Sequence, residues 1–316
     1  MFDRGAIDLV VYGTEAPAGL LACAKLAEEA GLAGIWVGDS PVLWRELYTL
    51  LGAAAARTGR VRLGPAVTNP VSRQLAVTAS ALMTLQELSG GRAALGLGLG
   101  ASALRTVGAR PARLAELESA VAELRSFWAD SGNGLAYGAG QPRIPIHLGA
   151  SGPRMLELSG RIGDGCLAVV GLHPRQLEAA RERIAAGGPR KGFELTFWVP
   201  FAVADESAPA REAVKSYVAR SLRHPLPAEL TPLEQEAAER IRASYSYEQH
   251  LAPDADHARL VPDEIVADWA IAGTPDDCRK QLERLDLRRG DRIGLVPMGR
   301  SPKLAQVRRF VSEVLE

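Results

Sequence analysis

The chain has 316 residues, of which 47% are hydrophobic, and its 37 lysine and arginine residues balance 37 aspartate and glutamate residues. A chain without net charge has no overall field that would attract a nucleic acid or an anionic membrane, so we exclude both as partners. Its three dispersed cysteines indicate neither a disulfide framework nor a zinc or redox pair, and its first residues lack the pattern of an export signal. We therefore expect a cytoplasmic protein.

Short apolar runs alternate along the chain with segments of helical periodicity. The eight runs cover residues 7–12, 34–37, 61–67, 93–99, 144–148, 166–170, 195–204 and 292–297. Such alternation predicts a parallel sheet, and eight strands close a (β/α)8 barrel, which needs about 250 residues as one unit. We expect an α/β fold in which residues 1–316 form a single TIM-barrel domain.

The segment of residues 205–262, after the seventh strand, is longer than a connection in a barrel needs to be, and prolines interrupt its helical stretches. They predict a helical insertion, which either walls the substrate pocket or lies at the periphery. The sequence Thr274-Pro275-Asp276-Asp277 after it has the form of a capping box at a helix start. His147 falls inside an apolar strand, where we expect an interior histidine with satisfied hydrogen bonds.

The active site of such a barrel lies at the carboxyl ends of its strands, so the polar and glycine residues directly after each apolar run are candidates. They are Tyr12, Thr14, Asp39, Ser40, Thr68, Asn69, Gly98, Gly100, Ser102, Ser151, Gly152, Gly171 and His173. The sequence contains no H-x-x-x-H pair and no G-x-S-x-G elbow, so zinc hydrolysis and triad acyl transfer lack their parts. We expect no metal site.

Two of these strand ends suggest a ligand. The run Gly96-Leu97-Gly98-Leu99-Gly100 differs from the G-x-G-x-x-G dinucleotide pattern, and its glycines permit either a flat ring against the backbone or close strand–helix packing. Ser151-Gly152-Pro153 begins a helix, where free N–H groups favour a phosphate, unless the serine hydroxyl caps them. Asp39 ends an apolar strand, and its carboxylate either belongs to the site or caps the loop or helix that follows.

Five stretches occur in a characteristic order: GLAGIWVGDS, RLGPAVTNP, LQELSGGRAALGLGLGASALRTVG, PIHLGASGPRMLELSGRIGDG and AGTPDD. Together they resemble the luciferase-like monooxygenase superfamily, particularly its deazaflavin-dependent branch, which uses coenzyme F-420 and includes methylenetetrahydromethanopterin reductase. The resemblance implies a barrel whose mouth holds a flavin or deazaflavin, with hydride moving at ring carbon C5 of the deazaflavin. It also implies a homodimer, since relatives are often dimers.

The same resemblance implies roles for individual residues. Asp39 matches an acid near the cofactor, and Ala66 and Val67 match a bulge of the third strand that contains a non-prolyl cis peptide behind the ring. Gly98 and Gly100 match ring neighbours on the fourth strand. The turn that binds the phosphate matches Ala150, Ser151 and Gly152, and we expect further cofactor contacts from Thr68, Leu99 and Gly171.

The chain departs from its relatives at two positions close to the expected chemistry. Relatives commonly have histidine where this chain has Ser40, and some have a carboxylate where it has Tyr12. The familiar proton donor is therefore missing, and Tyr12 either donates a proton or packs on the ring. The catalytic candidates are Asp39, Tyr12 and Ser40.

Three functions remain open. The first is an oxidoreductase that transfers a hydride between coenzyme F-420 and an unknown organic substrate. The second is an FMN-dependent monooxygenase supplied with reduced flavin by a partner reductase. The third is a cofactor-binding barrel that has lost catalysis, which the missing histidine and carboxylate would explain.

Overall fold

Parallel strands form the centre of the computed structural model, which describes residues 3–129, 134–224, 230–247, 249, 251–252 and 254–316. The strands are β1 (Ile7–Val11), β2 (Gly34–Val37), β3 (Arg62–Pro65), β4 (Leu95–Leu97), β5 (Ile146–Ala150), β6 (Gly165–Ala168), β7 (Glu194–Val203), β8 (Ile271–Gly273) and β9 (Asp291–Pro297). Their order is β3-β2-β1-β9-β7-β6-β5-β4, and β8 pairs with β7. Bridges from Leu63 to Ala93 and from Thr68 to Leu97 bring the two edges together, so the sheet closes as a (β/α)8 barrel.

The eight predicted strands are the strands of this barrel, and β8 is the strand that the prediction missed. β8 has only three residues, too few for a periodic pattern to be recognised, and it pairs with the last residues of β7. β3 ends at Pro65, two residues earlier than predicted, and the peptide between Ala66 and Val67 that follows it is cis.

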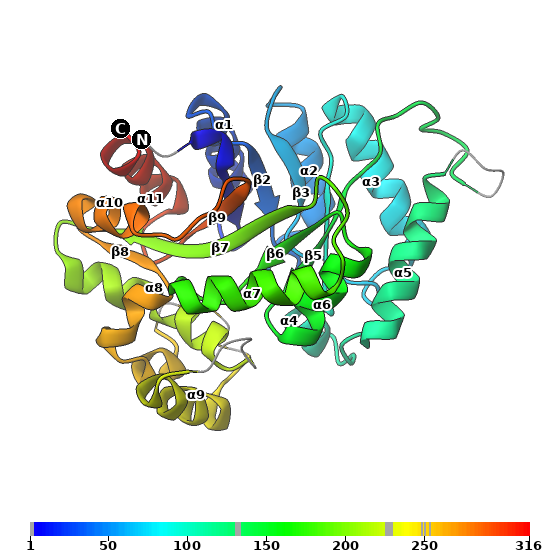
Figure 1. Cartoon of the computed structure of the whole chain (residues 1–316). Coiled ribbons are helices and arrows are strands. Elements are labelled where there is room, and N and C mark those ends of the chain that lie inside the picture. The colour runs from blue at the N-terminus through cyan, green and yellow to red at the C-terminus, as the bar shows by residue number, and fades with distance from the viewer. Residues whose placement is uncertain (1–2, 130–133, 225–229, 248, 250, 253) are drawn as a thin grey trace.

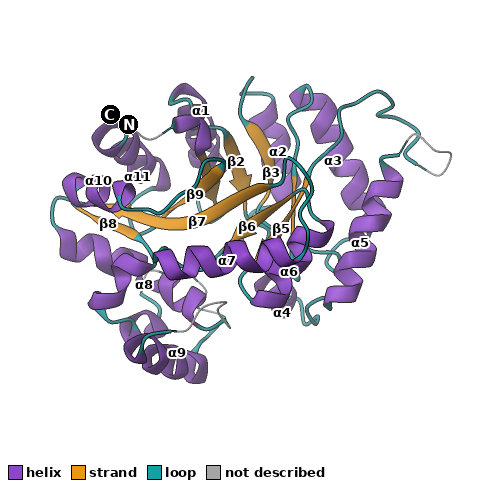
Figure 2. Ribbon diagram, viewed as in Figure 1, coloured by secondary structure: helices purple, strands orange, loops and turns teal. Residues whose placement is uncertain are grey.

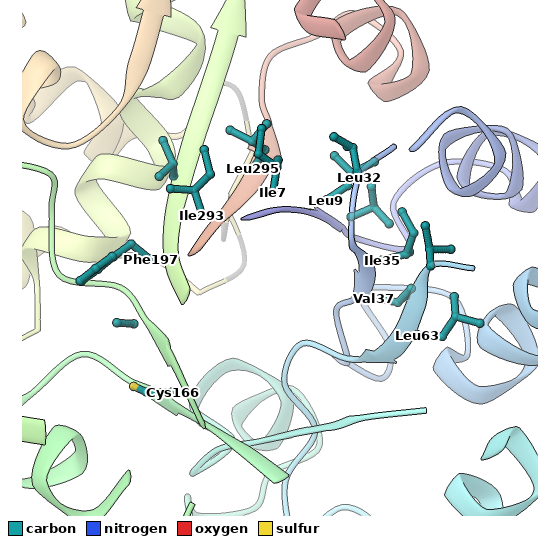
Figure 3. Close-up of a cluster of buried hydrophobic side chains, with 14 of the residues drawn as sticks. Ile7, Leu9, Leu32, Ile35, Val37, Leu63, Cys166, Phe197, Ile293 and Leu295 are labelled. Atoms are coloured by element: carbon teal, nitrogen blue, oxygen red, sulfur yellow. The ribbon is translucent and has the colours of Figure 1, made fainter. Parts of the chain in front are cut away.

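Helices surround the barrel and bury its outer face (Figures 1 and 2). They are α1 (Pro17–Glu29), α2 (Leu47–Ala55), α3 (Leu75–Ser89), α4 (Ala101–Arg105), α5 (Leu114–Phe127), α6 (Pro153–Ile162), α7 (Pro174–Ala186), α10 (Pro275–Glu283) and α11 (Lys303–Arg309). Ile7 and Leu9 of β1 belong to the main apolar cluster shown in Figure 3, whereas Val10 belongs to a second cluster with Trp36. This alternation follows from the opposite orientation of successive side chains along a strand.

A polar layer fills the barrel near the amino-terminal ends of its strands. Asp8 pairs with Arg292 at 2.8 Å, and Arg62 pairs with Glu194 at 2.6 Å and lies 3.4 Å from Nε2 of His147. His147 is buried as expected, but its Nδ1 has no partner in the described part of the chain, so the expectation of a satisfied ring is wrong. These residues come from five strands, and their pairing offsets the cost of burying their charges.

The chain after β7 forms α8 (Ser207–Leu222) and α9 (Pro232–Ser244), followed by 3-10 turns at Asp256–Leu260 and Asp263–Asp268. Both helices fall within residues 205–262, for which a helical insertion was predicted. Figure 1 shows α8 and α9 at the bottom of the view, on the same side as α4, which directly follows β4. Among the described residues, no helix combines the length and the apolar character needed to cross a membrane.

The helix start at Thr274 has the predicted capping box. Its hydroxyl accepts a hydrogen bond from the backbone N–H of Asp277, and the Asp277 carboxylate accepts one from the backbone N–H of Thr274. The hydroxyl of Ser207, at the first turn of α8, also donates to this carboxylate. Asp277 thus joins the start of α10 to the start of the segment after β7.

Candidate functional site

A cavity of about 510 Å³ lies at the carboxyl ends of the barrel strands. Its volume is in the range usual for sites that bind small molecules and cofactors. Eleven of the predicted site residues line it: Tyr12, Asp39, Ala66, Val67, Gly98, Leu99, Gly100, Ser102, Ala150, Ser151 and Gly152. The strand-end rule therefore brings residues that are far apart in the sequence to one place.

Six candidate residues do not line this cavity: the strand-end residues Thr14, Asn69 and His173, and three that were also assigned to the cofactor or the chemistry, Ser40, Thr68 and Gly171. Ser40 is buried beside it, and its hydroxyl lies 3.4 Å from that of Ser102, which does line the cavity. Thr68 is fully buried and donates to Asp39. Gly171 adopts a φ of 93° and packs against Gln176, and it does not line the cavity.

One wall of the cavity is apolar and follows β3, β4 and β5. The peptide between Ala66 and Val67 is cis, as the resemblance implied. A Cβ atom on Gly98 would lie 2.7 Å from Cγ2 of Val67, and one on Gly149 would lie 2.9 Å from its Cγ1. Glycine is therefore needed at Gly98 for Val67 to pack there. The sequence left two explanations for this glycine run, a flat ring against the backbone or close packing of the chain. Close packing applies at Gly98, which also faces the cavity.

Asp39 is held in an ion pair at the edge of this wall. Its Oδ2 accepts hydrogen bonds from the Thr68 hydroxyl and from Nη1 of Arg73, both at 2.6 Å. The second Nη of Arg73 reaches Glu46 at 3.0 Å. Burial lowers the pKa of Arg73, but Asp39 outweighs that effect and raises it. The carboxylate thus accepts from side chains and does not cap the backbone that follows it.

The helix start at Ser151 and Gly152 faces the cavity without a side-chain cap. The N-cap of α6 is Gly152, and no side chain accepts a hydrogen bond from the first turn. The capping role that the sequence left open for the Ser151 hydroxyl is therefore wrong. Uncapped N–H groups and the positive end of the helix dipole favour an anion here, and the exposed Arg154 adds a cation to the same rim.

Tyr12 lies across the barrel from this turn. The strand order places β1 four positions from β5 in an eight-strand ring, so the ends of these strands oppose each other. The ring of Tyr12 contacts that of Trp44 with centroids 4.6 Å apart. Burial and the neighbouring Tyr217 raise the pKa of Tyr12 well above its usual value, although Arg220 acts in the opposite direction. The phenol therefore stays protonated at neutral pH and can donate a hydrogen bond, while the raised pKa makes it a weaker acid than a free tyrosine.

The sequence interpretation missed a group of cavity residues that do not follow strand ends. They are Trp44 from the loop after β2, Trp198 inside β7, and Arg220, Arg223 and His224 at the end of α8. The segment after β7 therefore walls the cavity, which decides between the two locations left open for it. Trp198 gave no signal because nearly all of β7 is buried and no alternation marks its inward face.

His224 gives the fold a dependence on pH that can be measured. Burial and the adjacent Arg223 lower the pKa of His224 to about 3, and burial and Arg62 lower that of His147 to about 4. The unfolded chain binds these protons below about pH 6.5 and the folded chain does not, so stability falls with decreasing pH by up to about 1.4 kcal/mol per pH unit for each histidine.

We expect the substitution His224→Gln to reduce this acid destabilisation. Urea unfolding of the wild type and the variant at about pH 7 and about pH 4.5 measures it, and the free energy of unfolding should fall more between these pH values for the wild type than for the variant. The difference between the two proteins isolates His224 from the carboxylates, which titrate in both. Parallel pH dependences of the two proteins would contradict the assignment.

Comparison with known proteins agrees with this architecture. Residues 2–291 match the family described as luciferase-like monooxygenase. The chain is 32% identical over 285 residues to the 5,10-methylenetetrahydromethanopterin reductase of Methanolobus tindarius, covering 83% of this chain and 85% of that protein. It is 30% identical over 292 residues to an F420-dependent glucose-6-phosphate dehydrogenase of Beutenbergia cavernae, covering 83% and 82%. The fold matches the F420-dependent tetrahydromethanopterin reductase of Methanopyrus kandleri with a TM-score of 0.73 at 23% identity, over 99% of both chains.

Proposed function

The chain belongs to the luciferase-like monooxygenase family, and from this membership we propose that it is an oxidoreductase that transfers a hydride between coenzyme F-420 and a small organic substrate. The observation that carries the proposal is that one cavity contains both the apolar wall at Val67 and Gly98 and the uncapped helix start at Gly152. A flat ring and a phosphate group joined in one molecule match these two features. The names of the relatives reported above support the deazaflavin as that molecule.

The residues present fit such a cofactor. The apolar wall, where Val67 packs against Gly98, would hold the ring. The backbone N–H groups at the start of α6 and the guanidinium of Arg154 would hold the phosphate. The Asp39–Arg73 pair holds the loop after β2 against this wall, which fixes the position of Trp44.

When bound, the deazaflavin supplies a ring carbon that accepts or delivers a hydride. The chain then has to orient the substrate, exclude water and manage a proton. The protonated Tyr12 is the hydrogen-bond donor that the geometry offers, since it lines the cavity opposite the proposed phosphate-binding turn at Gly152. Trp44 and Trp198 provide apolar surface beside it. Ser40 takes no direct part, because it reaches the cavity only through Ser102.

Titration of the purified protein with coenzyme F-420 and with FMN, followed by fluorescence, tests the proposal. We expect micromolar binding of coenzyme F-420 and binding of FMN at least tenfold weaker, a difference of about 1.4 kcal/mol or more. Tight binding of FMN without binding of coenzyme F-420 would favour the flavin-dependent monooxygenase. If neither cofactor binds, the proposal fails, and so does the assignment of Gly152 to a phosphate.

A further inference from the structure

Arg220 is a half-buried cation at the wall of the cavity, without a carboxylate counterion among the described residues. Its Nη1 is buried and has no hydrogen-bond partner in the described part of the chain, and none of the ion pairs found there includes it. The nearest group is the ring of Tyr217, whose centroid lies 4.9 Å from Cζ of Arg220. A guanidinium remains charged in proteins, so its burial without a carboxylate is costly.

A second donor lies beside Arg220. The hydroxyl of Tyr217 is buried and makes no well-aligned hydrogen bond among the residues that the structure describes, although weak hydrogen-bond contacts with Arg220 and Tyr12 affect its pKa. Neighbouring buried donors without a well-placed acceptor are unusual, because buried polar groups are nearly always paired. Arg220 lines the cavity, so an acceptor group that enters from the cavity would satisfy its Nη1.

The neighbouring Arg223 is better partnered, although its Nε is also buried without a hydrogen-bond partner among the described residues. Its Nη1 contacts the hydroxyl of Tyr247, its Nη2 lies 3.1 Å from His224, and its Cζ lies 4.4 Å from the centroid of Tyr245. Arg223 thus helps hold the end of α8 in place. His224 is neutral at pH 7 because of its low pKa. Arg220 is left as the cation that is free to bind a ligand.

The charges around the cavity agree with an anionic ligand. Among the described residues that line it, the only carboxylate is Asp39, and Arg73 already neutralises it. Arg154 lies at the helix start after β5, which we assign to the cofactor phosphate. Arg220 lies near Tyr12 after β1, on the opposite side of the barrel. The cavity therefore has two separate cationic places.

We propose that Arg220, with Tyr217 behind it, forms an anion subsite for the substrate. The substrate is then an organic acid whose carboxylate or phosphate ester binds there while its apolar body lies against Trp44 and Trp198. A guanidinium can donate two parallel hydrogen bonds to two oxygens of a carboxylate or of a phosphate ester. The inference rests on the proposed function, because it assigns the opposite side of the cavity to the cofactor. It also gives α8 a role in substrate recognition.

Isothermal titration calorimetry with small probes tests the subsite, using the full chain with and without saturating coenzyme F-420. The probes are phenylacetate, phenyl phosphate and the neutral phenylacetamide, which share an aromatic body. We expect at least one of the two anions to bind about 10- to 100-fold more tightly than the amide, as for a charge-assisted hydrogen bond. Which anion prevails distinguishes a carboxylate from a phosphate substrate.

The substitution Arg220→Met keeps the length and apolar stem of the side chain and should abolish the preference for the anion. The matched control is Arg211→Met on the same helix. Arg211 lies outside the cavity, 3.6 Å from Asp263, so its substitution should leave the preference for the anion intact. Equal binding of anions and amide to the wild type, or a preference that survives Arg220→Met, would overturn the subsite. If the protein binds anions through Arg220 but does not bind coenzyme F-420, the cofactor assignment is refuted and the anion subsite stands.

Discussion

Substitution of Gly152 by aspartate is expected to lower the affinity for coenzyme F-420 at least 100-fold, or about 2.7 kcal/mol. Gly152 is the N-cap of α6 at a φ of −102°, a conformation that any residue adopts. An aspartate there would cap the free N–H groups itself and place a negative charge where the phosphate binds. Like charges about 4 Å apart repel by about 4 kcal/mol near a protein surface. Fluorescence titration of the wild type and the variant measures the loss.

The control for this experiment is Gly152→Asn, which adds a side chain of the same size without the charge. Both residues are good N-caps, so neither variant should have a lower melting temperature than the wild type. We expect the asparagine variant to lose clearly less affinity than the aspartate variant. If both bind coenzyme F-420 as tightly as the wild type, the phosphate does not bind at α6.

Substitution of Glu234 by glutamine is expected to lower the free energy of unfolding by about 3 kcal/mol. The carboxylate of Glu234 is fully buried and accepts hydrogen bonds from Arg175 at 2.8 Å, from Trp269 at 3.0 Å and from the backbone and hydroxyl of Thr231. Its partners lie on α7, on the chain before β8 and at the start of α9. Removing the charge leaves Arg175 without its counterion and mismatches the donors that converge on one oxygen.

Urea unfolding measures this effect, and Glu236→Gln on the same helix is its control. Glu236 is exposed and forms a 3.8 Å pair with Arg240, for which a change of at most about 0.5 kcal/mol is expected. Limited proteolysis should cleave the segment after β7 faster in Glu234→Gln than in Glu236→Gln. Equal stability of the two variants would show that Glu234 does not anchor this segment to the barrel.

The barrel could be predicted from the sequence because its strands are apolar, short and separated by amphipathic helices. The bounds were less accurate at the end of β3, which stops at Pro65, before the cis peptide. β8 was missed because three residues show no period, and its pairing depends on the path of the chain after β7.

The candidate site could be predicted where it follows the strand ends. Tyr12, Asp39, Gly98 and Ser151 lie on one cavity because parallel strands end on the same face of a barrel. Arg220 could not be found in this way, because it lies on a helix whose direction is set by tertiary packing. The strand-end rule also placed Gly171 at the site, but this residue packs against Gln176.

The polar layer that includes Asp8 and His147 fills the barrel on the side away from the cavity. Both ligands of the proposed reaction must therefore pass through the same mouth, between the strand ends and α8. In kinetic terms, two ligands that share one entrance are expected to bind and leave one after the other.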